Sequence, residues 1–495
     1  MSTSYGLRST GLVVFSGRLV SAFTGLLFTL MAARWLSPSG FGTWEVIITI
    51  LTFASYPIGT VAYWATRDVA RGRMVGRTAL AAGALLSGAG LAVYFGFSFV
   101  TYSRIAASFT PFLLGALLVP LSYWSATANA IVNGYRPSVY GYSLVASELV
   151  KIAVAYVALY VYRLGIEGVI VGLLSAYFVQ SLVSTYMVRA TISEGLKGSE
   201  VRRWSRLFWL PAVSYLPTSL AVADTYIVAI LHGTSVVGTY QVAFIVASVV
   251  TYASSLIFAM YPLLLKGGDR RLPAVSLEFS MLFAIPMAAG CITLAGPILY
   301  MFGPKFIPGA LGLSILAVMF IVYNVSQLLD QTLMGTEKVD SVESPSFSRL
   351  ARSNLLFVPM VNITYGAVYL ATLFFAVSYA SVAGFSDQAD VAIWASVQLA
   401  ATFVFMLVKV RRARGVATIM PGVSVLYYLV GAGAMSAVVY ILAPLVAVQN
   451  LSTVVYGVRL LLLVLLGGGV YFGVVYAIDS KFRELAGAFA RRIRR

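Results

Sequence analysis

Long apolar segments separated by short polar ones run through this whole chain. An α-helix needs about 20 consecutive apolar residues to cross the hydrocarbon core of a bilayer. By that criterion the sequence predicts an all-α, polytopic membrane protein with 14 spanning helices. We expect these spans at residues 8–33, 41–65, 78–101, 108–133, 139–162, 166–190, 206–231, 237–264, 273–302, 307–334, 352–378, 389–409, 417–447 and 453–478.

The composition supports this class. Of the 495 residues, 60% are hydrophobic and 10% are charged, and the mean hydropathy is +0.90. A soluble fold needs more polar material to cover its surface. The first apolar stretch continues past 20 residues without a small-residue cleavage site, which indicates a retained span and not a signal peptide. The single cysteine excludes an intrachain disulfide, the single histidine excludes a His-rich metal site, and we expect no cofactor.

Basic residues are distributed very unequally between the two sides of the predicted spans. One side takes 27 of the 34 lysines and arginines, among them Arg67, Arg202 and Lys409, and the other side takes 4. Because cytoplasmic loops are enriched in lysine and arginine, both termini are predicted to be cytoplasmic. The net charge of +17 then reflects topology and contact with anionic lipid headgroups, and not nucleic-acid binding. The tail at 481–495 is expected to form a short interfacial helix.

A passage of the sequence occurs twice, 196 positions apart: "GTWEVIITILTFASY" and "GTYQVAFIVASVVTY". Six spans separate the two copies, and an even number preserves orientation, so we expect two parallel six-helix repeats that enclose a transport cavity. The acid Glu45 is replaced by Gln241 in the second copy and is interpreted as a solvated acid near the outer surface. The expected domains are an N-lobe at 1–195, a C-lobe at 196–410, two extra helices at 411–480 and a basic cytoplasmic tail at 481–495.

These features resemble a known family. An arginine in the first span, the segment "AARWLSPSGFGTWEV" and the turns "NGYRP" and "MGTEK" are similar to the polysaccharide-transporter branch of the multidrug/oligosaccharidyl-lipid/polysaccharide exporter superfamily. That branch includes the O-antigen-type flippases, and the resemblance covers about residues 8–480 in layout. It implies a monomeric transporter, not an enzyme, in the plasma membrane of a prokaryote. Its cargo would be a polyprenyl-diphosphate-linked oligosaccharide, moved to the outer leaflet by alternating access for polysaccharide or glycoprotein assembly.

Charged residues inside predicted spans are the candidate site residues, because a charge at mid-membrane needs a partner or a wet cavity. Arg18 lies near the middle of the first span, and its guanidinium suits the oxygens of a diphosphate. The alternative is a hydrogen bond to a neighbouring helix. The lipid II flippases have an Arg-Asp pair one to two turns later, where this chain has Thr24 and Gly25, which argues against a peptidoglycan precursor as cargo.

Two polar pairs in the next spans extend the candidate substrate site. Glu148 and Lys151 are three residues apart and share one helix face. They either neutralise each other or leave Lys151 as a second cation for the diphosphate. Asn129 and Asn133 are spaced i, i+4 and could bond sugar hydroxyls or the neighbouring helix.

Two acids in the second half are candidates for proton or sodium coupling. Asp224 follows Pro211 and Pro217, which are expected to break its helix. Asp330 has amide side chains around it and is expected to be partly hydrated near the cytoplasmic end of its span. The sequence contains no G-x-x-x-x-G-K-[ST] loop, so an ion gradient, the membrane potential or consumption of the product would supply the energy.

Two other functions are compatible with a polytopic chain. A multidrug or cation antiporter of the same superfamily normally has 12 spans and a more acidic cavity, whereas mid-membrane charges here are more often basic. A membrane-bound glycan polymerase or acyltransferase usually needs catalytic groups on a sizeable outer loop. The single histidine and the short predicted outer loops argue against such an enzyme.

Overall fold

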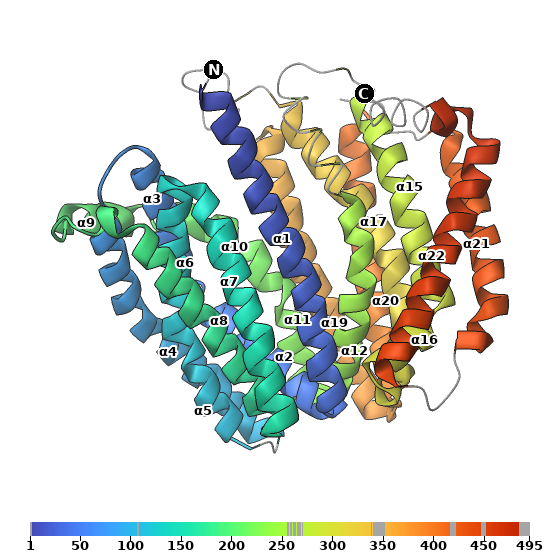
Figure 1. Ribbon diagram of the computed structural model, residues 1–495, viewed down its shortest axis with the longest axis horizontal. Coiled ribbons are helices and arrows are strands. Elements are labelled where there is room, and N and C mark those ends of the chain that lie inside the picture. Colours follow the sequence, from blue (N-terminus) through green and yellow to red (C-terminus); the bar gives the residue numbers. More distant parts are fainter. Residues whose placement is uncertain are drawn as a thin grey trace. The chain divides into compact units, whose positions relative to one another are not determined.

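The computed structural model describes residues 2–105, 108–254, 271–337, 352–415, 422–446 and 452–484, with the single residues 257, 260, 264, 269 and 339. Within these ranges the chain is helical and contains no β-strand (Figure 1). The chain forms two compact units, Met1–Gly238 and Thr239–Arg495. The all-α, polytopic prediction is confirmed, because most helices are long and apolar enough to cross a membrane.

The number of such helices in the described residues is 11, or up to 12 if one bent pair counts as a single span. Two predicted spans are not included in this number. The first belongs to α1 (Ser2–Trp35), in which Val20–Trp35 is apolar, and the span predicted at 206–231 is divided into two short helices. The larger total of 14 therefore stays a prediction.

The first unit begins with α1 and reaches into α12. Its helices are α1 (Ser2–Trp35), α2 (Pro38–Ala54), α3 (Ile58–Ala70), α4 (Gly76–Ile105), α5 (Thr110–Ala116), α6 (Leu118–Tyr135), α7 (Pro137–Tyr156) with the π-turn η1 (Val157–Val161), α8 (Ile166–Met187), η2 (Arg189–Thr191), α9 (Gly198–Arg206), α10 (Trp209–Ala221), α11 (Ala223–His232) and α12 (Thr234–Ala247). Helix α1 runs along α7, which packs on α8, and α6 lies against α3, α4 and α8 (Figure 1).

Prolines set several helix boundaries in this unit. Pro38 occupies the first turn of α2, and the Ser37 hydroxyl accepts a hydrogen bond from the Gly40 amide at 3.0 Å, which caps the helix. The span predicted at 41–65 bends by 58° between α2 and α3, and Pro57 immediately precedes α3. Pro217 lies inside α10, which ends shortly before α11 begins. A proline cannot donate the i→i−4 hydrogen bond, so bends at these points are expected.

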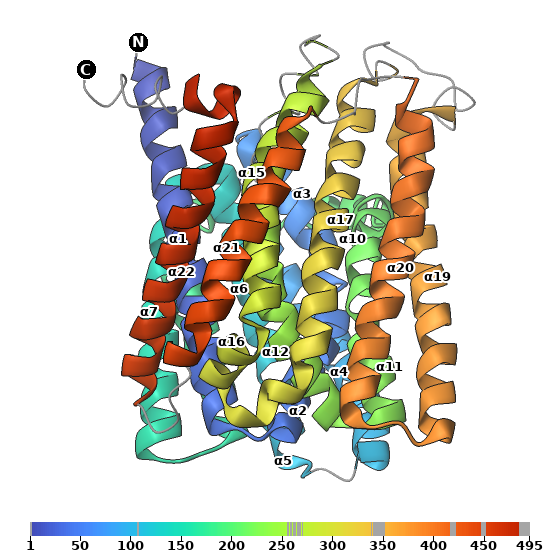
Figure 2. The same cartoon turned by 90° about the vertical axis from the view of Figure 1, so that its right-hand side faces the viewer.

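The second unit contains the remaining helices. They are η3 (Ser248–Ser254), α15 (Leu272–Thr293), α16 (Ala295–Phe302), η4 (Pro304–Gly309), α17 (Ala310–Gly335), α19 (Asn354–Ala383), α20 (Asp387–Ala413), α21 (Ser424–Val446) and α22 (Thr453–Ile478). Figure 2 shows α21 and α22 side by side, next to α15. The hydroxyl of Tyr471 donates to the Leu282 carbonyl at 2.8 Å, and that of Tyr456 donates to the Pro297 carbonyl at 2.9 Å. These bonds attach α22 to α15 and α16.

Equivalent helices of the doubled sequence have equivalent neighbours within each unit. In the first unit, α6 packs against α3, α4 and α8. In the second unit, α17 packs against η3, α15 and α20. In the order of the predicted spans, α6 and α17 are each the fourth helix of a set of six. In both sets the fourth helix packs against the second, the third and the sixth. The unit boundary falls inside α12, whereas the lobe boundary predicted at residue 195 precedes α9 and stays a prediction.

The two copies of the repeated passage meet at their glycines. A Cβ atom built on Gly42 would lie 2.8 Å from the amide nitrogen of Gly238 and would overlap the Thr234 carbonyl. A Cβ atom built on Gly238 would lie 2.9 Å from the amide nitrogen of Gly42 and would overlap the Pro38 carbonyl. The contact is reciprocal and leaves no space for a side chain on either helix. Glu45, one turn later, is half-buried, so its interpretation as a solvated acid was wrong.

The predicted interfacial helix in the tail falls largely outside the described residues. Positions 481–484 are helical, and residues 485–495 lie outside the described ranges.

Candidate functional site

A buried ion pair lies on α7 in the first unit. The Lys151 ammonium is 2.6 Å from Oε2 of Glu148, and both residues are 8% exposed. Two hydroxyls of α1 also bond the carboxylate: Ser21 Oγ donates to Oε1 at 3.1 Å, and Thr24 Oγ1 donates to Oε2 at 2.5 Å. The ammonium lies 5.3 Å from the centre of the Phe28 ring. The geometry therefore fits the interpretation in which Glu148 and Lys151 neutralise each other, and a role for either in binding cargo stays a prediction.

Arg18 belongs to the same part of α1. Its backbone lies one helical turn before Ser21, whose hydroxyl bonds Glu148. The side chain of Arg18 lies outside the described residues. Its proposed contact with a diphosphate stays a prediction.

The two asparagines of α6 have different surroundings. Asn129 donates to Ser125 Oγ at 3.3 Å and accepts from Ser184 Oγ at 3.0 Å, so it joins α6 to α8. Ser125 continues this network by donating to Gln180 at 3.1 Å. Asn133, one turn later, is exposed. Asn129 thus serves helix packing in this structure, and only Asn133 offers an exposed amide.

A second buried ion pair joins α17 and α20 in the second unit. The Lys409 ammonium lies 2.8 Å from Oδ2 of Asp330 and 2.8 Å from Ser326 Oγ. Asn362 on α19 donates to the same carboxylate oxygen at 3.3 Å. Asp330 is 7% exposed, so the expectation of a partly hydrated acid was wrong. Lys409, predicted at the basic end of its span, is 4% exposed, and its place on the cytoplasmic side stays a prediction.

The other candidate for ion coupling, Asp224, lies in the first turn of α11. It is buried, and its Oδ1 accepts from the amide of Thr225 at 2.6 Å and from the Thr225 hydroxyl at 3.3 Å. An acid at a helix N-terminus is stabilised by the helix dipole. The break between α10 and α11 agrees with the disruption expected from Pro211 and Pro217. A role of Asp224 in coupling stays a prediction.

Sequence reasoning missed an acid at the basic end of the first unit. Asp68, at the end of α3, is 1% exposed, and its Oδ2 accepts from Arg203 and, at 2.9 Å, from Trp204 Nε1. Arg73 lies 3.7 Å from its other oxygen, and Glu200 is 2.8 Å from Arg203. The available signal was a single acid within a run of arginines, which had been interpreted as topology alone. The cluster fastens α9 to α3.

No group of three or more His, Cys, Asp or Glu side chains in the described part of the chain could hold a metal ion. The polar sites described above are ion pairs and hydrogen-bonded clusters between helices.

We compared the sequence and the fold with those of known proteins. No family model matches the chain. Over 498 aligned residues it is 21% identical to the probable flippase AglR of Haloferax volcanii, and the alignment covers 95% of each chain.

Three solved structures share the fold. The lipid II flippase MurJ, in an inward closed conformation, matches with a TM-score of 0.65, 11% identity and coverage of 94% of this chain and 98% of MurJ. An inward-facing multidrug transporter of the MATE family matches with a TM-score of 0.58, 14% identity and coverage of 79% of this chain and 94% of the transporter. A transporter from Pyrococcus furiosus matches with a TM-score of 0.52, 14% identity and coverage of 82% and 96%. The last two are described as members of the MOP superfamily.

The similarity in sequence extends over nearly the whole chain, and the fold is shared over the same extent. The chain is therefore a multi-pass membrane protein that has the fold of these transporters and is similar in sequence, over nearly its whole length, to a probable flippase.

Proposed function

We propose that this protein is a flippase that moves a lipid-diphosphate-linked oligosaccharide from the cytoplasmic to the outer leaflet by alternating access. The product would serve the assembly of cell-surface polysaccharide or glycoprotein. The observation that carries the proposal is similarity to a probable flippase along 95% of both chains. The protein is a transporter and not an enzyme.

The extent of structural similarity supports the flippase over the antiporter alternative. The structural alignment with the lipid II flippase covers 94% of this chain, whereas the alignment with the inward-facing multidrug transporter covers 79%. The chain thus shares with the flippase a portion that the multidrug transporter does not match. Helices α21 and α22, beyond the predicted repeats, suit this portion, and a groove beside them would accommodate the lipid tail of the cargo.

The proposal includes a finer topology than the helix count alone supports. With α1 and the α10–α11 pair counted as spans, the chain crosses the membrane 14 times as two parallel six-helix repeats and two extra helices. Both termini are then cytoplasmic, in the plasma membrane of a prokaryote. The recurrence of the α6 neighbours around α17 supports such repeats. The lobes would comprise 1–195 and 196–410, and the transporter would act as a monomer.

Arg18 is the residue assigned to the diphosphate, because it lies in a spanning helix next to a second charged cluster. Lys151 and Glu148 form that cluster, and Lys151 would reach the cargo only if its pairing with Glu148 loosened. Asn133 is better placed than Asn129 to bond a sugar hydroxyl, because its side chain is exposed. Asp224 and Asp330 are the residues assigned to proton or sodium coupling.

A reconstituted assay tests the function. The full chain is placed in liposomes that contain a polyprenyl-diphosphate-linked oligosaccharide, and exposure of the glycan at the opposite leaflet is measured with a glycan-cleaving enzyme. The wild type is expected to accelerate exposure, and Arg18→Ala to reduce the rate at least tenfold. Arg104→Ala changes an exposed arginine at the end of α4 and serves as the matched control.

The outcomes distinguish the alternatives. Full activity of Arg18→Ala with an active wild type would remove Arg18 from the cargo site and leave the function intact. Absence of glycan exposure together with efflux of cationic drugs by the same liposomes would replace the flippase proposal with the antiporter.

A further inference from the structure

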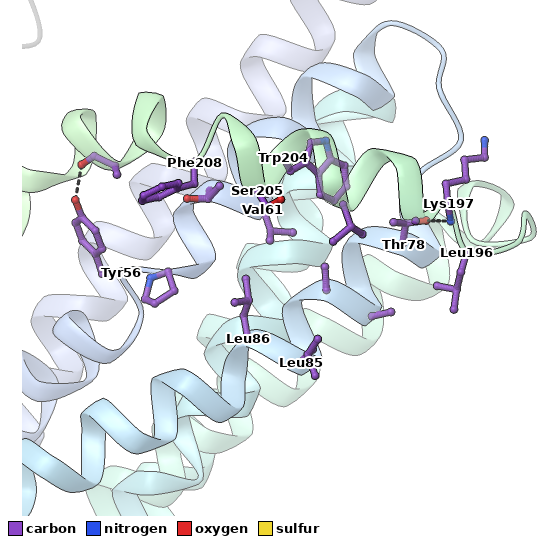
Figure 3. A pocket seen from close by; sticks show the side chains of 17 residues that line it. Tyr56, Val61, Thr78, Leu85, Leu86, Leu196, Lys197, Trp204, Ser205 and Phe208 are labelled. Carbon is purple, nitrogen blue, oxygen red and sulfur yellow. Dashed lines mark hydrogen bonds between the residues drawn. The ribbon is translucent and has the colours of Figure 1, made fainter.

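An apolar groove lies in the first unit between α3, α4, α9 and α10 (Figure 3). Its volume is about 820 Å³, within the range of ligand-binding pockets. Leu85 and Leu86 of α4 line one side, and Val201 and Trp204 of α9 and Phe208 line another. Leu85 is 82% exposed and Phe208 is 58% exposed, so apolar surface lies open in the groove.

Polar groups at the edge of the groove already have partners. Thr78 Oγ1 accepts the backbone amide of Lys197 at 3.0 Å, and the Tyr56 hydroxyl donates to the Ala212 carbonyl, as the dashed lines of Figure 3 show. The Ser205 hydroxyl donates to the Arg202 carbonyl at 2.9 Å. Because these groups are satisfied within the protein, they offer little to a polar ligand. An apolar chain is the better match for the interior.

Helix α9 presents three different faces. Gly198, Val201 and Ser205 line the groove, at the i, i+3, i+7 spacing of one helix face. Arg203 and Trp204 point to the buried acid Asp68, which fixes the helix against α3. The third face is formed by the residues that directly follow Val201 and Ser205 in the sequence, and it carries cations.

Those cations are Arg202 and Arg206, which are spaced i, i+4 and follow Val201 and Ser205 directly. Both are exposed, and no ion pair is recorded for either in the described ranges of the chain. The nearby acids are already engaged: Glu200 bonds Arg203, and Glu194 bonds Lys197. A positive surface that pairs with no acid among the described residues therefore borders an open apolar groove.

We propose that this groove binds an anionic phospholipid of the leaflet on the basic side of the protein. One acyl chain lies along Leu85, Val201 and Phe208, and the phosphate contacts Arg202 and Arg206 on the adjacent face of α9. The combination of an apolar interior and unpaired arginines at the rim matches the two parts of such a lipid. Clusters of lysine and arginine near a membrane surface attract anionic headgroups.

The occupant differs in kind from the transport cargo. The site lies within one unit and consists of α9, Phe208 and residues of α3, α4 and α10. Most polar side chains that line it have partners within the protein, and Thr60 adds a single hydroxyl, which is little for the sugars of an oligosaccharide. Lipid binding here would hold α9 at the membrane surface while Asp68 holds it to α3.

Native mass spectrometry of the purified full chain tests the site. The probes are dioleoylphosphatidylglycerol and dioleoylphosphatidylcholine, which share acyl chains and differ in headgroup charge. The wild type is expected to retain the anionic lipid with the higher affinity. Ala81→Trp fills the groove and is expected to abolish retention, whereas Ala84→Trp, on another face of α4, retains it. The Trp pair also controls for folding, because both variants add the same side chain to an exposed position of one helix.

A charge variant tests the headgroup contact. Arg202→Gln with Arg206→Gln is expected to lower affinity for the anionic lipid roughly fivefold per arginine and to leave the neutral lipid unchanged. Arg104→Gln is the matched control.

Three results would overturn the proposal: equal retention of both lipids by the wild type, equal retention by the two Trp variants, or a polyprenyl diphosphate displacing the phospholipid from the groove. The readout is lipid retention, so failure of glycan transport would leave this test unaffected.

Discussion

The two buried ion pairs each neutralise a buried carboxylate, but their partners come from different parts of the chain. Glu148 and Lys151 are neighbours on one helix, and two hydroxyls from α1 complete the coordination of the carboxylate. Asp330 and Lys409 come from different helices, 79 residues apart. Oδ2 of Asp330 takes both Lys409 and Asn362, and Oδ1 has no partner among the described residues.

This difference separates a local pair from a tertiary one. The α7 pair forms wherever α7 is helical, because an i, i+3 spacing brings the charges together. The second pair exists only when α17, α19 and α20 are packed, so it reports on the assembly of the second unit. Without its lysine, Asp330 would keep one hydrogen-bond donor, Asn362, whereas Glu148 would keep two, Ser21 and Thr24. Breaking the second pair is therefore expected to be the more damaging change.

The largest effect is predicted for Lys409→Met. Loss of the ammonium leaves Asp330 buried without its cation, which typically costs about 3–5 kcal/mol. Chemical unfolding of the detergent-purified protein, followed by tryptophan fluorescence, measures the loss. Arg411→Met changes an exposed cation two residues away and is expected to unfold like the wild type. Equal midpoints for both variants would contradict a stabilising role for the pair.

Removing both charges is predicted to recover most of that loss. In Asp330→Leu with Lys409→Met no buried charge remains, and an apolar replacement of a buried pair is often neutral. Ser326 and Asn362 then lose a partner, so a residual cost of about 1–3 kcal/mol is expected. A double-mutant cycle on the unfolding free energies measures the coupling. Additive single effects would show that the two charges act independently.

A smaller effect is predicted for Lys151→Met. Glu148 keeps the hydroxyl donors of Ser21 and Thr24, so we expect a loss of about 1–3 kcal/mol in the same unfolding assay. Lys481→Met is the comparison: its ammonium is 65% exposed and 3.2 Å from Glu278, and such a surface pair contributes up to about 1 kcal/mol. A loss for Lys151→Met as large as that for Lys409→Met would reverse the proposed ranking.

The smallest effect is predicted for Ser21→Ala. It removes one of three partners of Glu148 and leaves Thr24 and Lys151 in place, so a loss of about 1 kcal/mol is expected. Glycan transport by this variant should stay close to the wild-type rate if the cluster only holds α1 to α7. A large loss of transport with unchanged unfolding would instead assign the cluster to cargo binding.

The same contrast explains what could be predicted from the sequence. Hydrophobic segments gave the helical class and most spans, because bilayer thickness fixes their length. The contact between Glu148 and Lys151 followed from helical spacing alone. The pairing of Asp330 with Lys409 could not be predicted in this way, because no local rule links positions 79 residues apart. Lys409 was interpreted only as one of the basic residues of the cytoplasmic side, because it adjoins Arg411 and Arg412 at the end of a span.

Asp68 illustrates a second limit. Its sequence context is a basic loop, and the positive-inside rule accounts for the arginines without reference to the acid. Only the folded chain brings Arg203 and Trp204 to it, from a helix more than 130 residues later. Helix breaks were easier to predict, because Pro217 acts on its own helix.

The reciprocal contact of Gly42 and Gly238 has a consequence for how this sequence can change over time. Gly42 is confined by the Thr234 carbonyl, four residues before Gly238, and Gly238 is confined by the Pro38 carbonyl, four residues before Gly42. A side chain gained at either position meets the same obstruction, and no substitution at the other glycine can relieve it, because that residue has no side chain to shorten. The two copies can therefore diverge freely around them, as Glu45 and Gln241 have, while both glycines remain under a shared purifying constraint.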